Sequence, residues 1–114
     1  MSDSILYSTE NSVAKIILNR PDKFNSFNRA MALQMQDALD KAAADKKIRA
    51  VYITGEGKAF CAGQDLTEAI DPSGPGIRKI VDEHYNPIIR RIRKLEKPVV
   101  IVGKVFVHKV VVWQ

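Results

Sequence analysis

The sequence is poor in the residues that build covalent or metal-bound scaffolds. Cys61 is its single cysteine, so an internal disulfide is excluded. His84 and His108 stand alone, without the spacing of a metal site, and we expect no metal. The N-terminus lacks the basic and apolar segments of a targeting peptide, and the apolar C-terminal stretch is too short and too charged for a membrane span. These absences favour a cytoplasmic protein.

The residues that are present are typical of one folded domain. Of 114 residues, 46% are apolar and 27% are charged, which is enough to bury a core. The formal net charge is +5, and much of the positive charge lies in residues 90–97. These cations alternate with apolar residues at the spacing of an amphipathic helix, which favours a solvated helix face. Attraction of a polyanionic ligand or a nucleic acid is the alternative, and charge alone does not decide between them.

Apolar periodicity and turn residues predict an alternation of strands and helices, and so an α/β fold. The polar residues 10–12 interrupt a β-branched segment, which indicates a hairpin. Pro87 is expected to kink or split a long helix. The tail from residue 103 has strong β propensity, and if it is exposed it would be an edge prone to aggregation. The expected elements are a hairpin over 5–19, a helix over 26–45, a strand over 49–54, a short helix over 66–70, a long helix over 77–95 and a strand over 99–102.

The loop after the strand at 49–54 is the first candidate site. Ala62 and Gly63 would let the backbone approach a ligand closely before the next helix begins. Backbone N–H groups at such a junction can hold an anion or a developing oxyanion. Glycine in a loop after a strand is more often part of a simple turn. The neighbouring residues must therefore distinguish a ligand-binding loop from such a turn.

Three blocks of sequence, in order, resemble the enoyl-CoA hydratase/isomerase (crotonase) family. They are residues 17–27 (ILNRPDKFNSF), residues 51–55 with 58–66 (VYITG and KAFCAGQDL), and residues 97–99 (KPV). The resemblance covers about residues 5–100. It implies repeated strand-strand-helix (ββα) units, here a truncated, N-terminal part of the core domain. It also implies the trimeric or hexameric assembly that is usual in the family.

The second block looks closest to the phenylacetate-pathway branch of the family, the ring-epoxide isomerases. The resemblance implies that the backbone N–H of Gln64 donates to the thioester oxygen of an acyl-CoA. Proton abstraction beside a thioester, or addition of water to its conjugated double bond, builds negative charge on that oxygen, and a fixed donor stabilises it. The residues that would bind CoA are Lys23, Phe24, Ser26, Ala62, Gly63, Asp65 and Leu66. CoA is part of the substrate, so we expect no separate cofactor and no nucleic-acid or membrane partner.

The chain departs from the family's pattern after residue 99. The family continues into a glycine-rich loop that gives a second N–H donor and often a catalytic carboxylate, whereas Val110 and Trp113 stand at those positions here. We therefore divide the chain into a partial acyl-CoA-binding domain over 1–100 and an atypical tail over 101–114. One hypothesis is an acyl-CoA hydratase or isomerase that is incomplete as written. The alternative is a catalytically silent fragment with at most weak CoA binding.

Other groups that could carry chemistry do not complete a mechanism. Asp82, Glu83 and His84 are consecutive and point in different directions around a helix, so we predict a solvated face. Cys61 has no visible partner base, and we predict a packing role for it. No residue is assigned as the catalytic acid or base.

Overall fold

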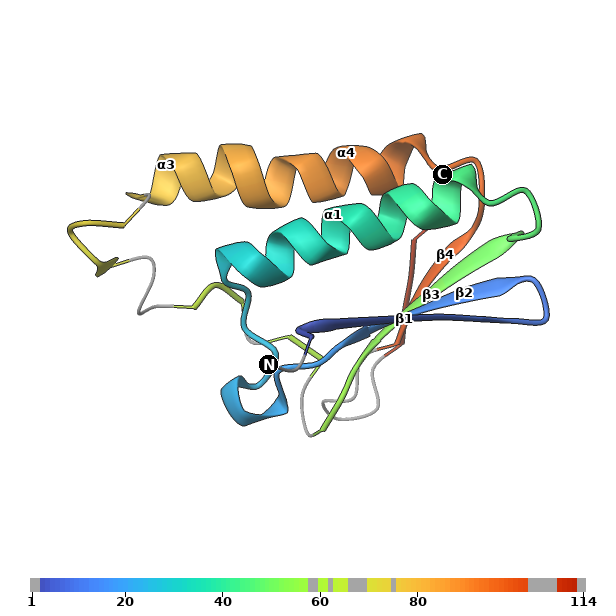
Figure 1. Ribbon diagram of the computed structural model, residues 1–114, viewed down its shortest axis with the longest axis horizontal. Helices are drawn as coiled ribbons and strands as arrows, with labels where there is room; N and C mark the ends of the chain where they lie inside the picture. The colour runs from blue at the N-terminus through green and yellow to red at the C-terminus, as the bar shows by residue number, and fades with distance from the viewer. Residues whose placement is uncertain are drawn as a thin grey trace.

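The computed structural model describes residues 3–57, 60–61, 63–65, 70–74, 76–102 and 109–112. Its strands form a five-stranded sheet in the order β1-β2-β3-β4-β5, and helices cover one face of that sheet (Figure 1). The elements in chain order are β1 (Ile5–Glu10), β2 (Val13–Leu18), the 3₁₀ turn η1 (Pro21–Lys23), α1 (Arg29–Ala44), β3 (Ala50–Gly55), α3 (Gly76–Ile80), the π-helical turn η2 (Val81–Tyr85), α4 (Asn86–Lys94), β4 (Val99–Val102) and β5 (Lys109–Val112).

The hairpin predicted for the first segment is confirmed. Strands β1 and β2 pair antiparallel from Ile5 opposite Leu18 to Glu10 opposite Val13. The connecting residues Asn11 and Ser12 have φ values of 51° and 66°. A two-residue turn with both φ angles positive matches the right-handed twist of the strands that it joins.

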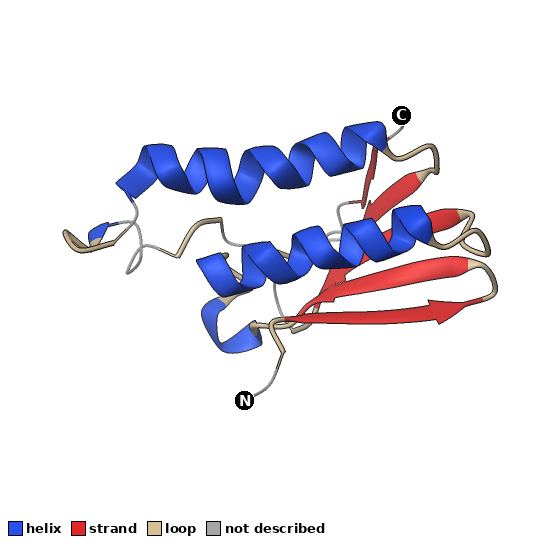
Figure 2. Cartoon of the chain, turned by 45° about the horizontal axis from the view of Figure 1, so that its top comes forward, coloured by secondary structure: helices blue, strands red, loops and turns tan. Residues whose placement is uncertain are grey.

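The centre of the sheet is parallel. β2 pairs with β3 and β3 pairs with β4, while β4 and β5 pair antiparallel. Parallel neighbours need long crossover connections. Here α1 provides the first, and the continuous α3-η2-α4 segment provides the second. Figure 2 shows from another angle that both connections lie on the same face of the sheet.

The core lies between this helical layer and the sheet. The predicted apolar stripe of α1 is buried, so the methionines at 31 and 35 are packing residues as expected. Helix α1 begins at Arg29 instead of Ser26, because the Asn28 side chain accepts a hydrogen bond from the N–H of Met31 at 2.9 Å and caps the helix. The buried residues of the two layers include Met31, Met35, Ala38, Leu39 and Ala42 from α1 and Ala14, Ile16, Leu18, Val51 and Ile53 from β2 and β3.

The second long helix is irregular next to Pro87, as expected, but it is not split: α3, η2 and α4 follow one another without a break. The irregular turn η2 precedes the proline, which has no N–H to donate to the carbonyl of Glu83 four residues before it. Helix α1 fixes this irregular turn in place. The Gln36 Nε2 donates to the carbonyl oxygens of Glu83 at 2.8 Å and His84 at 3.3 Å, so a buried amide side chain satisfies backbone groups of η2.

The β propensity of the C-terminal segment agrees with strand β5 (Lys109–Val112), the part of this segment that the structure describes. β5 is a strand at the edge of the sheet, with Val110 opposite Ile101. The predicted short helix at 66–70 falls almost wholly outside the described residues. Within the part of the chain that is described, no helix has the length and apolar character that a bilayer crossing requires.

Candidate functional site

The loop after β3 pairs with the segment that leads into α1. The N–H of Phe27 donates to the Gly63 carbonyl at 2.7 Å, and the N–H of Asp65 donates to the Phe27 carbonyl at 2.8 Å. This makes a parallel bridge between Phe27 and Gln64. Because backbone N–H groups alternate in direction along an extended segment, the N–H of Gln64 points away from Phe27. That orientation suits a donor to a group outside this ladder.

Gly63 owes its conformation to the absence of a side chain. Its φ of +102° is one that other residues rarely adopt, whereas a Cβ at this position would meet nothing within 4 Å. The Cys61 Sγ accepts a hydrogen bond from the Gly63 N–H at 3.4 Å, and the Gly63 carbonyl accepts one from the Phe27 N–H. Glycine is therefore required here by backbone direction and not by crowding.

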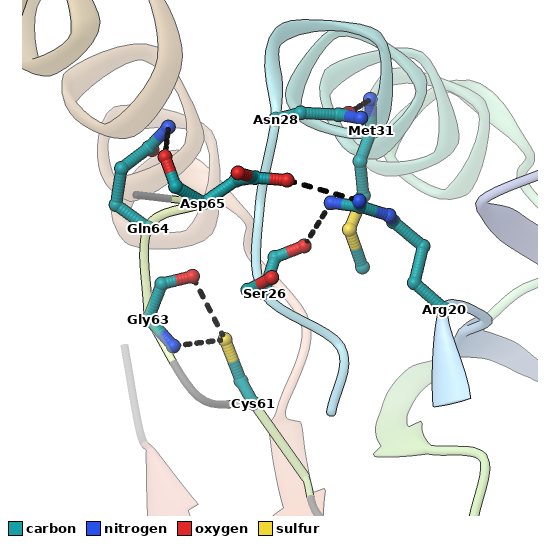
Figure 3. A network of polar contacts seen from close by, with 8 residues as sticks. All are labelled: Arg20, Ser26, Asn28, Met31, Cys61, Gly63, Gln64 and Asp65. Carbon is teal, nitrogen blue, oxygen red and sulfur yellow. Dashed lines mark hydrogen bonds and ion pairs between the residues drawn. The ribbon is translucent and has the colours of Figure 1, made fainter. Parts of the chain in front are cut away.

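Arg20 ties the two segments of the site together (Figure 3). Its Nη2 lies 3.0 Å from the Asp65 Oδ2, and its Nη1 donates to the Ser26 carbonyl at 2.6 Å. The side chains of Arg20 and Asp65 are only 15% and 17% exposed. The carboxylate of Asp65 thus faces a guanidinium of the same chain, which holds residues 63–65 against residues 26–27.

The turn that carries Arg20 is itself fixed by Asn25. Phe24 and Asn25 both have positive φ values, 53° and 60°. The fully buried Asn25 accepts the Arg20 N–H on its Oδ1 at 2.7 Å and donates from Nδ2 to the Glu56 carbonyl at 2.9 Å. An asparagine tolerates this left-handed conformation better than most residues. The turn is consequently bound to the loop that follows β3.

The structure brings together four of the predicted site residues: Ser26, Gly63, Gln64 and Asp65. Lys23 and Phe24 lie on the adjacent turn and are exposed. The predicted positions Ala62 and Leu66 lie outside the described residues, and so does Trp113.

Tyr85 is a member of this site that the sequence did not indicate. Its hydroxyl donates to the Gln64 Oε1 at 2.6 Å. The centroid of its ring lies 6.0 Å from the centroid of the Phe27 ring, with an interplanar angle of 57°. No motif or periodicity links residue 85 to residue 64, because their contact depends on the irregular turn η2.

The predicted solvated face at residues 82–84 is wrong for His84, which is fully buried. Its Nε2 lies 3.4 Å from the Arg29 Nη1, and the same Nη1 donates to the Glu83 Oε1 at 2.7 Å. The hydrogen bond from Arg29, with help from the charges of Lys79 and His84, lowers the pKa of the Glu83 carboxyl. The prediction assumed a regular helix, whereas the π-helical turn changes which residues face α1.

Cys61 is half-buried and packs against the core, as predicted. Burial raises the pKa of its thiol, and the hydrogen bond with Gly63 acts in the opposite direction. A raised pKa keeps the group as a thiol at neutral pH, which disfavours nucleophilic chemistry.

The basic stretch over residues 90–97, in α4 and just after it, contributes in part to helix packing. The Arg91 Nε lies 2.9 Å from the Asp40 Oδ1, and the Lys97 Nζ donates to carbonyl oxygens at the end of α1.

A cavity of about 360 Å³ lies between α1 and α4, and its lining residues are all distant in sequence from the loop at 63–65. Among the described residues, no three of the His, Cys, Asp and Glu side chains converge as metal ligands would.

Residues 8–106 match the family model described as enoyl-CoA hydratase/isomerase. The 1,2-epoxyphenylacetyl-CoA isomerase of Escherichia coli (strain K12) is 43% identical over 103 residues, which cover 88% of this chain and 39% of that protein. The trans-2-decenoyl-acyl-carrier-protein isomerase of Streptococcus mutans serotype c (strain UA159) is 35% identical, with 84% of this chain and 38% of that protein covered.

A crystal structure of an enoyl-CoA hydratase/isomerase from Xanthobacter autotrophicus Py2 matches with a TM-score of 0.80 and 29% identity, over 91% of this chain and 39% of that one. The chain therefore belongs to the enoyl-CoA hydratase/isomerase family and has its α/β crotonase fold. This confirms the family that the three sequence blocks indicated, and the likeness to its ring-epoxide branch that the second block indicated. The chain spans about two fifths of the length of these relatives.

Proposed function

We propose that this chain binds an acyl-CoA thioester and gives one N–H donor, that of Gln64, to an oxyanion hole of the hydratase/isomerase type. The observation that carries the proposal is the bridge between Phe27 and Gln64, which directs the Gln64 N–H away from the backbone of Phe27. A donor held in this way stabilises the charge that develops on a thioester oxygen. One such donor contributes about 3 to 4 kcal/mol to lowering the barrier.

The exposed turn beside the loop supports the binding part of the proposal. Phe24 is 54% exposed, which is high for a phenylalanine, and Lys23 next to it is also exposed. An aromatic face can stack on a nucleobase, and an ammonium group can pair with phosphate. CoA carries both groups. The turn is held rigidly by Asn25, so these side chains need little reorganisation of the backbone on binding.

A second candidate is a binding protein without catalysis. The observation that favours it is β5, in which Val110 is paired with Ile101 of β4. The family resemblance assigns a glycine-rich loop with the second donor to this part of the chain, and a strand does not reproduce such a loop. In this account Gln64 polarises a bound thioester, but no group completes the proton transfer.

Two glycines offer a matched test of the binding proposal. Gly63 and Gly76 both have positive φ values, and a Cβ on either would meet nothing within 4 Å. Gly63→Ala and Gly76→Ala therefore impose similar backbone strain in open space, but only the first lies at the proposed site. We expect calorimetric titration with crotonyl-CoA to show binding that weakens at least about tenfold in Gly63→Ala and stays unchanged in Gly76→Ala.

Equal affinities of the two variants would overturn the assignment of the loop at 63–65. Turnover then separates the two candidates. Loss of the conjugated double bond of crotonyl-CoA, followed by absorbance, identifies a hydratase, and double-bond migration in a β,γ-unsaturated acyl-CoA identifies an isomerase. Binding without either reaction supports the silent candidate. The trimeric or hexameric assembly and the cytoplasmic location stay predictions.

A further inference from the structure

The side chain of Gln64 is held by a second element, and this contact is separate from the backbone ladder. The Tyr85 hydroxyl donates to the Gln64 Oε1 at 2.6 Å, a short distance for a hydrogen bond between neutral groups. Tyr85 is the last residue of η2 and lies in the layer that covers the sheet. The proposed donor residue is thus connected to the helical layer as well as to the segment before α1.

Phe27 closes this arrangement into a ring of contacts. Its backbone pairs with Gly63 and Asp65 on either side of Gln64, while its side chain is buried and lies against the ring of Tyr85. Gln64 is therefore held from its backbone by Phe27 and from its side chain by Tyr85. Because Phe27 and Tyr85 also contact each other, movement of either one is transmitted to Gln64.

The turn that presents Tyr85 is anchored independently of this site. The Gln36 side chain of α1 donates to the carbonyls of Glu83 and His84, and His84 is fully buried beneath the turn. A π-helical turn is a costly departure from the regular helix, and such turns occur frequently at functional sites. Here the departure places the Tyr85 hydroxyl at Gln64, and Gln36 of α1 stabilises the turn through its carbonyl groups.

We propose that Tyr85 is a positioning residue for the oxyanion donor, acting through the side chain of Gln64. An N–H donor is useful only if it is fixed before charge develops on the substrate, and a donor that moves loses most of this effect. The bridge with Phe27 sets the direction of the Gln64 N–H, and the hydrogen bond from Tyr85 restrains the Gln64 side chain and so limits motion of the backbone that carries this N–H. This inference rests on the proposed function, because it presupposes that the Gln64 N–H faces the thioester.

Tyr85→Phe in the full chain removes only the hydroxyl and keeps the ring that lies against Phe27. The first measurement is ¹⁵N relaxation of the Gln64 amide without ligand. We expect an order parameter of about 0.85 in the unmodified chain and below about 0.6 in Tyr85→Phe. Tyr52→Phe is the control, since Tyr52 lies on β3 with its ring beside Lys15, and it should leave the Gln64 amide unchanged. An unchanged order parameter in Tyr85→Phe overturns the positioning role.

The second measurement follows crotonyl-CoA labelled with ¹³C at the thioester carbonyl. Binding to the unmodified chain should move this resonance downfield, because a donor polarises the carbonyl. In Tyr85→Phe we expect less than about half of that movement, with the affinity for free CoA changed by less than about twofold, since free CoA has no acyl carbonyl. An equal movement in both chains overturns the inference. No movement in the unmodified chain overturns the proposed function, and the relaxation measurement then decides alone whether Tyr85 positions Gln64.

Discussion

The Nη2 of Arg20 lies 3.0 Å from the Oδ2 of Asp65, and both side chains are largely withdrawn from solvent. The two residues are 45 positions apart, one before α1 and one in the loop after β3. Their ion pair joins the two segments from which the proposed site is built. Because the pair is mostly shielded from solvent, its coupling energy should exceed that of an exposed ion pair on the helical surface.

A double-mutant cycle tests this difference. Arg20→Met, Asp65→Asn and the double variant should give a coupling energy of about 1 to 2 kcal/mol in urea unfolding, because the pair is mostly buried and charge-assisted. The control cycle uses Arg91 and Asp40, which are 34% and 58% exposed at a similar distance of 2.9 Å. We expect less than about 1 kcal/mol there. Equal coupling in the two cycles would contradict a special role for Arg20.

Asn25 allows backbone strain to be separated from hydrogen bonding. Asn25→Ala loses the side-chain hydrogen bonds to Arg20 and Glu56 and places a residue with a Cβ, but without a polar side chain, at a φ of 60°. We expect a loss of roughly 2 to 4 kcal/mol in the free energy of unfolding. Asn25→Gly loses the same hydrogen bonds but adopts this φ freely, so it should cost about 1 kcal/mol less than alanine. A glycine variant no more stable than the alanine variant would show that strain is unimportant at this position.

Lys97 explains part of the Lys-Pro-Val block in structural terms. Its Nζ donates to the carbonyls of Ala42 at 2.6 Å and Asp45 at 2.9 Å, at the end of α1. A cation at a helix C-terminus satisfies carbonyls that the helix leaves unpaired and complements the helix dipole. Lys97→Met should cost about 1 to 2 kcal/mol of stability, as measured by urea unfolding. Lys94→Met, at an exposed position of α4, should change stability by less than about 0.5 kcal/mol.

The raised pKa of Cys61 predicts a pH dependence of both stability and reactivity. The folded chain favours the neutral thiol over the thiolate, so this contribution to stability is fully present below the ordinary pKa of 9.0 and is lost as the pH rises through the folded-state pKa. Alkylation by iodoacetamide just below that pH should be slower in the folded chain than in urea. Glutathione, measured in both solutions, corrects for the effect of urea on the reagent. Equal corrected rates would mean that the thiol is not protected by burial.

The sequence predicted the regular elements well where one physical signal dominates. The hairpin follows from polar residues between β-branched runs, and α1 follows from an uninterrupted apolar stripe. The loop at 63–65 was found because its residues form a recognisable block. The contacts of Arg20 with Asp65 and of Tyr85 with Gln64 were not found, since each joins segments whose proximity exists only in the folded chain. His84 was predicted to be solvated, but it is buried, because the apolar periodicity does not reveal a π-helical turn.

The parallel pairing of β3 on both sides determines the order in which this sheet can be completed. Val13 pairs with Ala50 across one helical connection, and Val51 pairs with Val99 across another. The pairing between β1 and β2 is local, so this hairpin can form as soon as it has been synthesised, whereas non-local pairs must first close long loops. On the ribosome, β3 therefore emerges with one neighbour already in place and carries an open edge until β4 has been translated.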